Sequence, residues 1–195
     1  MSLSVKIYPL GPLQENTYLI IDNNSGDKAI IDPGYIGDMV TKDIGDDSTL
    51  KYVLLTHAHD DHLSSAEEYL NKYKNAKFVA SIKEKYLIGK SFCPKVDIFV
   101  EEGDEIVLGE TKISFIETPG HTEGSMCIIA DDNIFSGDTL FRFSVGNTSF
   151  ETGNWDALQD SILKKLYTLN DDMKVFPGHG PYTTIGDEKR GNPFV

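Results

Sequence analysis

Residues 56–62 read THAHDDH, and this stretch holds three of the five histidines of the chain together with two aspartates. In an extended segment alternate side chains point the same way, so His57 and His59 can reach one metal ion together. Asp61 continues the alternation and His62 breaks it, so we expect these two residues to serve a second, neighbouring ion. The stretch therefore predicts a metal site made of two half-sites.

Neither half-site is complete with two ligands, because metals held by imidazole and carboxylate groups take about four to six. Three further motifs offer ligands: TPGHTEGS contains His121, FSGDTLF contains Asp138 and FPGHGPY contains His179. Each residue follows a glycine, which lets the backbone turn tightly and approach a site closely. Every histidine of the chain thus lies at the end of a strand-like run or in the loop after it, a placement that favours a shared site over packing in the core.

The rest of the chain alternates strand-like runs with helical ones. Turn residues at 25–27 predict a hairpin between two of the strands. Ser64 and Ser65, each three residues before a glutamate, predict capping boxes at a helix start. Strands mostly in hairpins, with separated helices, predict sheets packed together and covered by helices. The expected strands span 3–10, 16–22, 28–34, 51–57 and 77–81, with two runs each within 105–121 and 125–139. Residues 174–184 are expected to form a last strand that leads into a loop, and the expected helices span 36–45, 63–73 and 154–169.

Composition narrows the function classes. A length of 195 residues suits a single domain over 1–195. The net charge of −13 argues against nucleic acid as a partner and favours a small-molecule substrate. No run reaches the roughly 20 apolar residues of a membrane span, and the first residues lack a signal-peptide core. Cys93 and Cys127 are too few for a disulfide scaffold, so we expect reduced thiols in a cytoplasmic protein of undetermined oligomeric state.

The order H-x-H-x-D-H, G-H-T, G-D-T and P-G-H-G resembles the metallo-β-lactamase superfamily over nearly the whole chain, including IDPG at 31–34. Within it, GPLQENTYLI, GDTLF and the tail GHGPYTTIGDEKRGNPF resemble the glyoxalase II-like (hydroxyacylglutathione hydrolase-like) group. The resemblance implies an α/β fold (α+β in some schemes), a four-layer αβ/βα sandwich with the site at one edge of two facing sheets. It also implies the full ligand set: His57, His59 and His121 for the first ion, Asp61, His62 and His179 for the second, and Asp138 as the bridge.

Such a centre predicts hydrolysis. The ions are expected to be zinc, with iron or manganese as alternatives, because His and Asp ligands suit all three. A metal ion lowers the pKa of bound water to about 7, so a bridging hydroxide would attack a carbonyl at neutral pH. The metals would stabilise the oxyanion and the leaving thiolate, with Asp61 and Asp138 as catalytic carboxylates. The expected function is dinuclear metal-dependent hydrolysis of a thioester, S-lactoylglutathione or another acyl thioester.

One departure from the group bears on the substrate. Members commonly show a pattern resembling G-R-T-D after the bridging aspartate, where this chain has GNTS at 146–149. Both charged positions are neutral, and the chain is too short for the helical extension with which larger glyoxalase II enzymes hold glutathione. The thiol of the substrate is therefore left open. Asn147 and Tyr182 are candidate substrate contacts, although Tyr182 also fits a packed side chain, and Asp32 fits either a support for a ligand or a turn.

Other functions remain as alternatives. A persulfide dioxygenase uses a related fold with a single iron held by two histidines and an aspartate, and other superfamily hydrolases cleave esters, lactones or phosphodiesters. A β-lactamase fits poorly without an export signal, and a nuclease fits poorly with the charge of −13. A non-catalytic module, as in flavodiiron proteins, would be fused to a flavin domain that this chain lacks.

Overall fold

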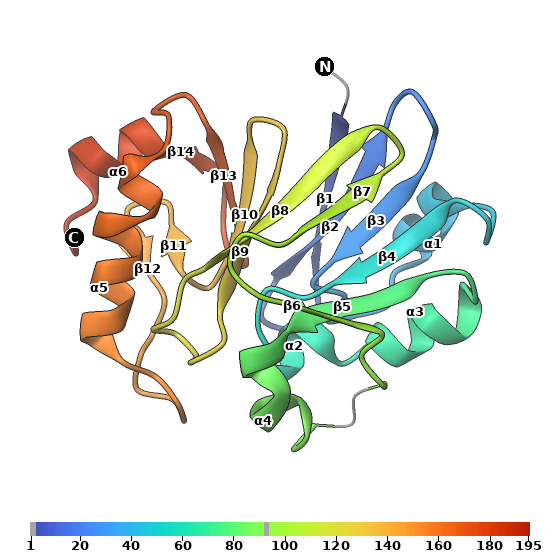
Figure 1. Ribbon diagram of the computed structural model, residues 1–195, viewed down its shortest axis with the longest axis horizontal. Coiled ribbons are helices and arrows are strands. Elements are labelled where there is room, and N and C mark those ends of the chain that lie inside the picture. The colour runs from blue at the N-terminus through green and yellow to red at the C-terminus, as the bar shows by residue number, and fades with distance from the viewer. Residues whose placement is uncertain (1–2, 92–93) are drawn as a thin grey trace.

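The computed structural model describes residues 3–91 and 94–195. Over these residues the chain forms two six-stranded sheets that face one another (Figure 1). In spatial order the first sheet consists of β1 (Leu3–Leu10), β2 (Glu15–Asp22), β3 (Lys28–Ile31), β4 (Leu50–Leu54), β5 (Lys77–Ser81) and β6 (Ile98–Val100). The second consists of β14 (Thr183–Thr184), β13 (Lys174–Pro177), β10 (Asn133–Gly137), β9 (Met126–Ala130), β8 (Thr111–Glu117) and β7 (Glu105–Leu108), and a small hairpin is formed by β11 (Leu140–Phe141) and β12 (Ser144–Val145).

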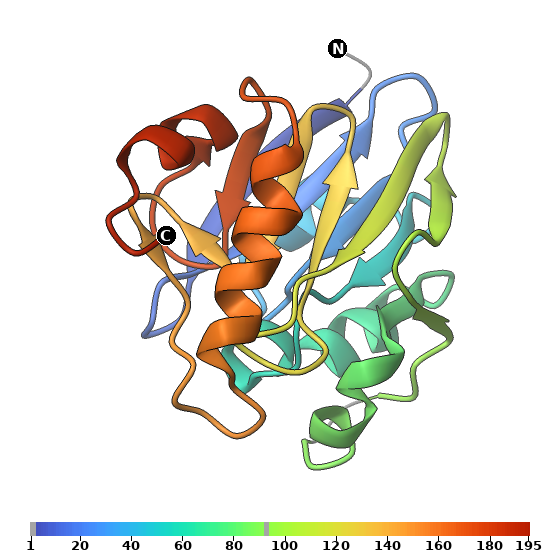
Figure 2. The same cartoon turned by 60° about the vertical axis from the view of Figure 1, so that its left-hand side comes forward.

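Helices cover the outer face of each sheet, and Figure 2 shows α5 lying across the second. The buried apolar side chains of the described residues form three clusters: one beneath α1 and α3, one between the sheets and one beneath α5. This arrangement confirms the predicted four-layer αβ/βα sandwich. The helices on the side of the first sheet are α1 (Asp38–Ile44), α2 (Asp60–Leu63), α3 (Ala66–Lys72), η1 (Ile82–Glu84) and α4 (Lys85–Ile88), and those on the side of the second are α5 (Trp155–Lys164), η2 (Leu166–Thr168) and α6 (Ile185–Gly191).

Strand direction decides where the loops lie. In the first sheet β3, β4 and β5 run parallel, so the loops after them leave the same edge. In the second sheet β10 is parallel to β13 and antiparallel to β9, which is itself antiparallel to β8. The carboxyl ends of β8, β10 and β13 therefore share one edge, and those three ends carry the glycine-flanked motifs.

The predicted helix over 63–73 is wrong in its first turn. The structure has two short helices, α2 and α3, with a break at Ser64 and Ser65. Neither capping box forms, because the Ser64 hydroxyl donates to the Asp60 carbonyl at 2.5 Å and the Ser65 hydroxyl donates to the Gly34 carbonyl at 3.3 Å. Asp61 is helical because α2 begins at Asp60, so the extended alternation assumed for it from the sequence is also wrong.

The other predicted elements are confirmed with shifted ends. The helix expected over 154–169 is α-helical to Lys164 and then becomes the 3₁₀ turn η2. Cys127 is buried and free, as predicted, whereas Cys93 lies outside the described residues. The sequence did not predict α4, α6, β6 or the β11–β12 hairpin, which are all short.

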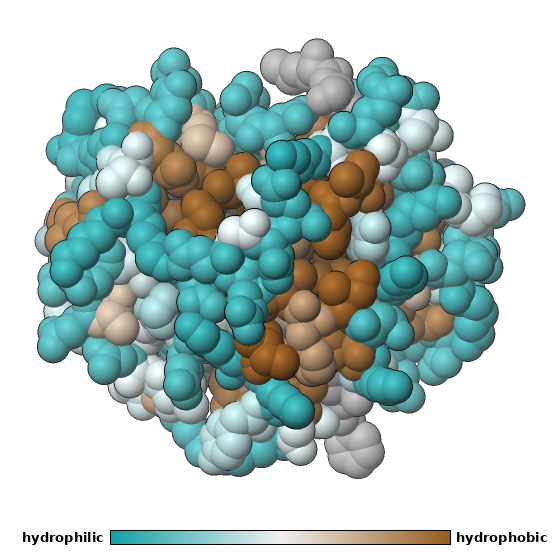
Figure 3. All heavy atoms as spheres, in the orientation of Figure 1, coloured by the Kyte–Doolittle hydropathy of each residue, from teal (hydrophilic) through white to brown (hydrophobic). Residues whose placement is uncertain are grey.

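The sheets end in β6 and β7, and Figure 3 shows apolar side chains gathered over these edge strands. Phe99 in β6 is 38% exposed and Val107 in β7 is 58% exposed. Within the described ranges, no helix is both long and apolar enough to cross a membrane.

Candidate metal centre

All seven predicted ligands meet at one edge of the two sheets. The first sheet supplies four of them from the loop after β4 and from α2, and the second supplies three from the loops after β8, β10 and β13. In chain order these are His57 and His59 in the loop, Asp61 and His62 in α2, His121 after β8, Asp138 after β10 and His179 after β13.

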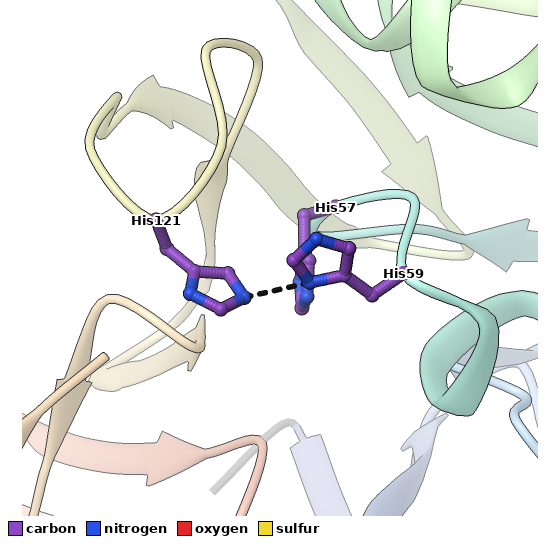
Figure 4. A group of neighbouring side chains, drawn as sticks. All are labelled: His57, His59 and His121. Atoms are coloured by element: carbon purple, nitrogen blue, oxygen red, sulfur yellow. Dashed lines mark hydrogen bonds between the residues drawn. The ribbon is translucent and has the colours of Figure 1, made fainter. Parts of the chain in front are cut away.

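The side chains fall into the two groups expected from the sequence. The ligand atoms of His57, His59 and His121 all lie within 4.8 Å of one another. Figure 4 shows these three rings directed toward one another, with His59 Nδ1 lying 2.8 Å from His121 Nε2. The ligand atoms of the other group meet the same limit, and its members are Asp61, His62 and His179. We refer to the two groups as the first and second half-sites.

Asp138 lies between the half-sites. Its Oδ1 is 3.4 Å from His62 Nε2, and its Oδ2 is 3.5 Å from His121 Nε2 and 3.7 Å from His179 Nε2. This approach depends on Gly178, because a Cβ there would collide with the Asp138 carboxylate and the His62 ring. One carboxylate therefore contacts both half-sites.

A single carboxylate, that of Asp32, orients one histidine of each half-site. His62 Nδ1–H donates to Asp32 Oδ2 at 3.0 Å. Thr56 Oγ1–H donates to the same oxygen at 2.6 Å, so the Thr56 oxygen accepts from His57 Nδ1–H at 3.1 Å. Of the two interpretations open for Asp32 in the sequence, the structure therefore supports the role of holding a ligand.

Backbone carbonyls orient two other rings. His121 Nδ1 donates to the Asn147 carbonyl at 2.7 Å, and His179 Nδ1 donates to the Leu13 carbonyl at 3.3 Å. A ring whose Nδ1 carries the proton presents the lone pair of Nε2. The outer hydrogen bond of His121 therefore leaves an unprotonated Nε2 facing the centre, whereas His179 Nε2 lies 3.3 Å from Asp61 Oδ2.

Three inward-facing atoms indicate whether the site suits a metal ion. His57 Nε2, His62 Nε2 and Asp138 Oδ1 are buried and have no hydrogen-bond partner among the described residues. Such atoms cost free energy when left unpaired, and buried polar groups rarely remain so. Imidazole nitrogen and carboxylate oxygen are ligands that zinc, iron and manganese all accept. The donor set and its unpaired atoms fit metal binding.

The half-sites differ in charge. Burial lowers the pKa of His57, His59 and His121, so these rings are neutral at neutral pH. Burial also opposes protonation of His62, but the neighbouring carboxylates, Asp138 and Asp32, outweigh it and hold the pKa of His62 well above its usual value.

The acids of the site are ionised. Partial burial opposes ionisation of Asp61, but the hydrogen bond from His179 and the charge of His62 lower its pKa to about 2. The same hydrogen bond raises the pKa of His179. Burial opposes ionisation of Asp138 as well, but the charge and hydrogen bond of His62, together with His121 and His179, outweigh it and lower the pKa of Asp138.

The ligands open into a pocket of about 390 Å³. Leu13 and Phe150 border it and are 64% and 53% exposed, and the Phe150 ring lies 5.2 Å from the His59 ring. A larger hollow of about 700 Å³ lies at the amino ends of β10 and β13, opposite the ligands. The lining of the smaller pocket is Leu13, His59, Asp61, His121, Asp138, Phe150 and His179.

The two candidate substrate contacts do not line this pocket. The side-chain oxygen of Asn147 accepts from the Ser149 N–H at 2.9 Å and from the Ser149 hydroxyl, so it folds back on its own loop. The Tyr182 side chain is 56% exposed, and its ring lies 6.0 Å from that of Phe176. Contacts from either residue to a substrate stay predictions.

Sequence reasoning missed several residues around the ligands. Glu15 is fully buried, and its Oε1 lies 3.9 Å from His62 Nδ1 without a hydrogen bond among the described residues. Burial raises the pKa of Glu15 to about 9. Phe150 and Leu13 lie in loops with no periodic pattern. Only Glu15 gave a signal in the sequence, because it stands directly before the apolar run of β2, where a charged residue is unusual.

Comparison with known proteins places this geometry in a family. The family model described as the metallo-beta-lactamase superfamily matches residues 10–179. The hydroxyacylglutathione hydrolase GloC of Haemophilus influenzae is 35% identical, over 99% of this chain and 98% of its own length. The crystal structure of the BLEG-1 B3 metallo-β-lactamase shares 31% identity with a TM-score of 0.87, covering 98% of this chain and 99% of that one. The structure of TTHA1623 in a di-iron-bound form shares 31% identity with a TM-score of 0.86, covering 97% of this chain and 100% of that one. Since the family match spans most of the chain and the relatives align over nearly their full length, the chain belongs to the metallo-β-lactamase superfamily.

Proposed function

We propose that residues 1–195 form one hydrolase domain that binds two divalent metal ions, most simply zinc, and cleaves a thioester. The observation that carries this proposal is the pair of half-sites joined by Asp138. Two relatives support it: one is named a hydroxyacylglutathione hydrolase, and the other is described in a di-iron-bound form.

His57, His59 and His121 would hold the first ion, Asp61, His62 and His179 the second, and Asp138 would contact both. When bound, the ions would supply a water of lowered pKa and a place for negative charge that develops on a carbonyl oxygen. Asp61 is ionised at neutral pH and faces the pocket, so it can accept a hydrogen bond from water and orient it. Asp138 also lines the pocket and has the same capacity.

The side chains that border the pocket favour a substrate with an apolar group. Leu13 and Phe150 are exposed there, and none of the described residues that line the pocket is Lys or Arg. A carboxylate-rich thiol such as glutathione would find no Lys or Arg in this lining. The proposal therefore covers acyl thioesters as a class, with glutathione as one thiol to be tested.

A second candidate is supported by one observation. His57, His62 and Asp138 form a compact group of two histidines and one aspartate. That composition also suits a single iron, as in the persulfide dioxygenase alternative. The two candidates differ in metal content and in oxygen consumption.

Metal analysis of the purified protein, combined with a substrate panel, tests the proposal. We expect two metal ions per chain and release of free thiol from S-lactoylglutathione or a simpler acyl thioester. The panel should include a lactone and a phosphodiester, because hydrolysis of either one alone would replace the proposed substrate class. One iron per chain with oxygen uptake in the presence of a persulfide would contradict the proposal and favour the dioxygenase.

A further inference from the structure

Glu84 is a buried acid outside the ligand set. It ends the 3₁₀ turn η1 after β5, and its residue is 1% exposed. Its Oε2 accepts the N–H of Ala58 at 3.0 Å, and its Oε1 accepts the N–H of Gly124 at 3.1 Å. The Thr122 hydroxyl also donates to Oε1. All three donors come from loops distant in sequence, so the carboxylate joins segments that lie far apart in the chain.

These donors adjoin the ligands of the first half-site. Ala58 separates His57 from His59 in the loop after β4, and Thr122 directly follows His121 in the loop after β8. Glu84 thus bonds to the loop of the first sheet with one oxygen and to the loop of the second sheet with the other. A backbone hydrogen bond from Met126 N–H to the Thr56 carbonyl, 3.0 Å long, also links the loops, but beside the ligand segments rather than within them.

The sequence of the loop after β8 allows it to approach Glu84 closely. A Cβ at Gly124 would collide with the backbone at Lys83 and Glu84, so glycine is needed for its N–H to reach the carboxylate. The Thr122 hydroxyl gives its proton to Glu84 and therefore accepts from Ser125 Oγ at 2.7 Å. The carboxylate, the hydroxyl and the glycine together fix the loop that carries His121.

We propose that Glu84 is a positioning residue that sets the separation between the His57–His59 loop and His121, and thereby the affinity of the first half-site for its metal ion. The inference rests on the proposed function, because that half-site must bind a metal. Without the carboxylate, the N–H groups of Ala58 and Gly124 would be buried and unpaired, which favours movement of both loops. Loss of a residue that supports a metal ligand commonly lowers metal affinity by about 10–100-fold.

The test compares Glu84→Gln with a matched variant, Asp22→Asn. Asp22 is also a fully buried carboxylate that joins two loops, since it accepts from Ser25 N–H, Glu110 N–H and the Thr111 hydroxyl. It lies at the far end of β2, away from the ligands. Both substitutions replace a buried carboxylate by an amide of the same shape, so Asp22→Asn controls for the loss of a buried carboxylate away from the ligands.

The first measurement uses metal-free protein. Glutamine keeps one acceptor oxygen and places an NH2 group where the other oxygen was, so the amide of either Ala58 or Gly124 loses its acceptor. Hydrogen exchange at that amide should become faster in Glu84→Gln, and exchange at both amides should stay unchanged in Asp22→Asn. Unchanged exchange in Glu84→Gln would overturn the proposal. This measurement needs no metal. A wild-type protein that binds no metal ion would therefore contradict the proposed function without deciding the role of Glu84.

The second measurement is a metal titration against a competing chelator. We expect Glu84→Gln to bind one ion about 10–100-fold more weakly while the other keeps its affinity, and Asp22→Asn to bind both as the wild type does. Equal weakening of both ions in Glu84→Gln would assign it a merely structural role. Thr122→Val, which removes a single donor, should weaken the same ion to a smaller extent and provides the test if Glu84→Gln does not fold.

Discussion

The two half-sites use the same ring chemistry in opposite electrostatic settings. His57, His59 and His121 lie together in a buried group whose pKa values are lowered, and Asp138 is the one acid among the seven ligands that reaches it. In the second half-site, His62 lies 3.0 Å from Asp32 and its pKa is raised well above its usual value. A metal ion entering the first half-site meets neutral nitrogens, whereas one entering the second must displace a proton.

The contrast teaches that nearby sites with similar ligands need not bind alike. The second half-site offers more negative charge, which favours harder cations, while the first offers mainly imidazole. The supports differ as well: Glu84 accepts from the loops of the first half-site, whereas Asp32 accepts directly from His62 of the second and reaches His57 of the first only through Thr56. Variants that affect one half-site, both or neither can therefore test the comparison.

The largest effect is expected from Asp138→Asn, since this carboxylate contacts both half-sites. Losing its charge should lower the affinity for both metal ions and lower kcat/KM for the best thioester on the order of 10³-fold. Metal content and steady-state kinetics measure the change. If the affinity for only one ion falls, Asp138 is not shared and the two groups are separate sites.

A paired substitution should separate the half-sites. His121→Ala removes a ligand from the first and His179→Ala removes one from the second, so each should retain one tightly bound ion and lose about 10²-fold in activity. Filling the remaining site with Co²⁺ should give a different visible spectrum for each variant, because the ligand sets differ. Identical Co²⁺ spectra for the two variants would show that the division into two half-sites is wrong.

A smaller effect concerns Glu15 beneath His62, and it appears in the pH dependence of stability. Its pKa is about 9 in the folded protein against a usual value of 4.5, so between these pH values the folded state retains a proton that the unfolded state has lost. Stability should therefore fall as pH rises through this window. Glu15→Gln removes the linkage and should stabilise the metal-free protein by about 1–3 kcal/mol at pH 7.5 and by little at pH 4.5. Thermal melting at both pH values measures this, and a pH-independent difference would contradict it.

The smallest effect is expected from Tyr182→Phe. The side chain is exposed and does not line the pocket, so kcat/KM should change by less than about twofold. A tenfold rise in KM with kcat unchanged would restore Tyr182 as a substrate contact and extend the pocket beyond its present border.

Much of the centre could be predicted because its ligands follow simple rules. Histidines and aspartates at strand ends beside glycines indicated convergence, and parallel β8, β10 and β13 provide it. The position of Asp61 in a helix was not predictable from alternation, because the chain turns at His59 to begin α2. Glu84 gave no signal, since its partners come from loops 26 to 40 residues away and meet only after the sheets pack.

The carboxylate of Asp32 has a thermodynamic consequence for the centre. One of its oxygens accepts from His62 of the second half-site and, through Thr56, orients His57 of the first. An ion that fixes one of these rings also fixes the acceptor on which the other depends. With two ions bound as proposed, we expect binding at the two half-sites to be cooperative, and by linkage each ion would change the affinity for the other by the same factor.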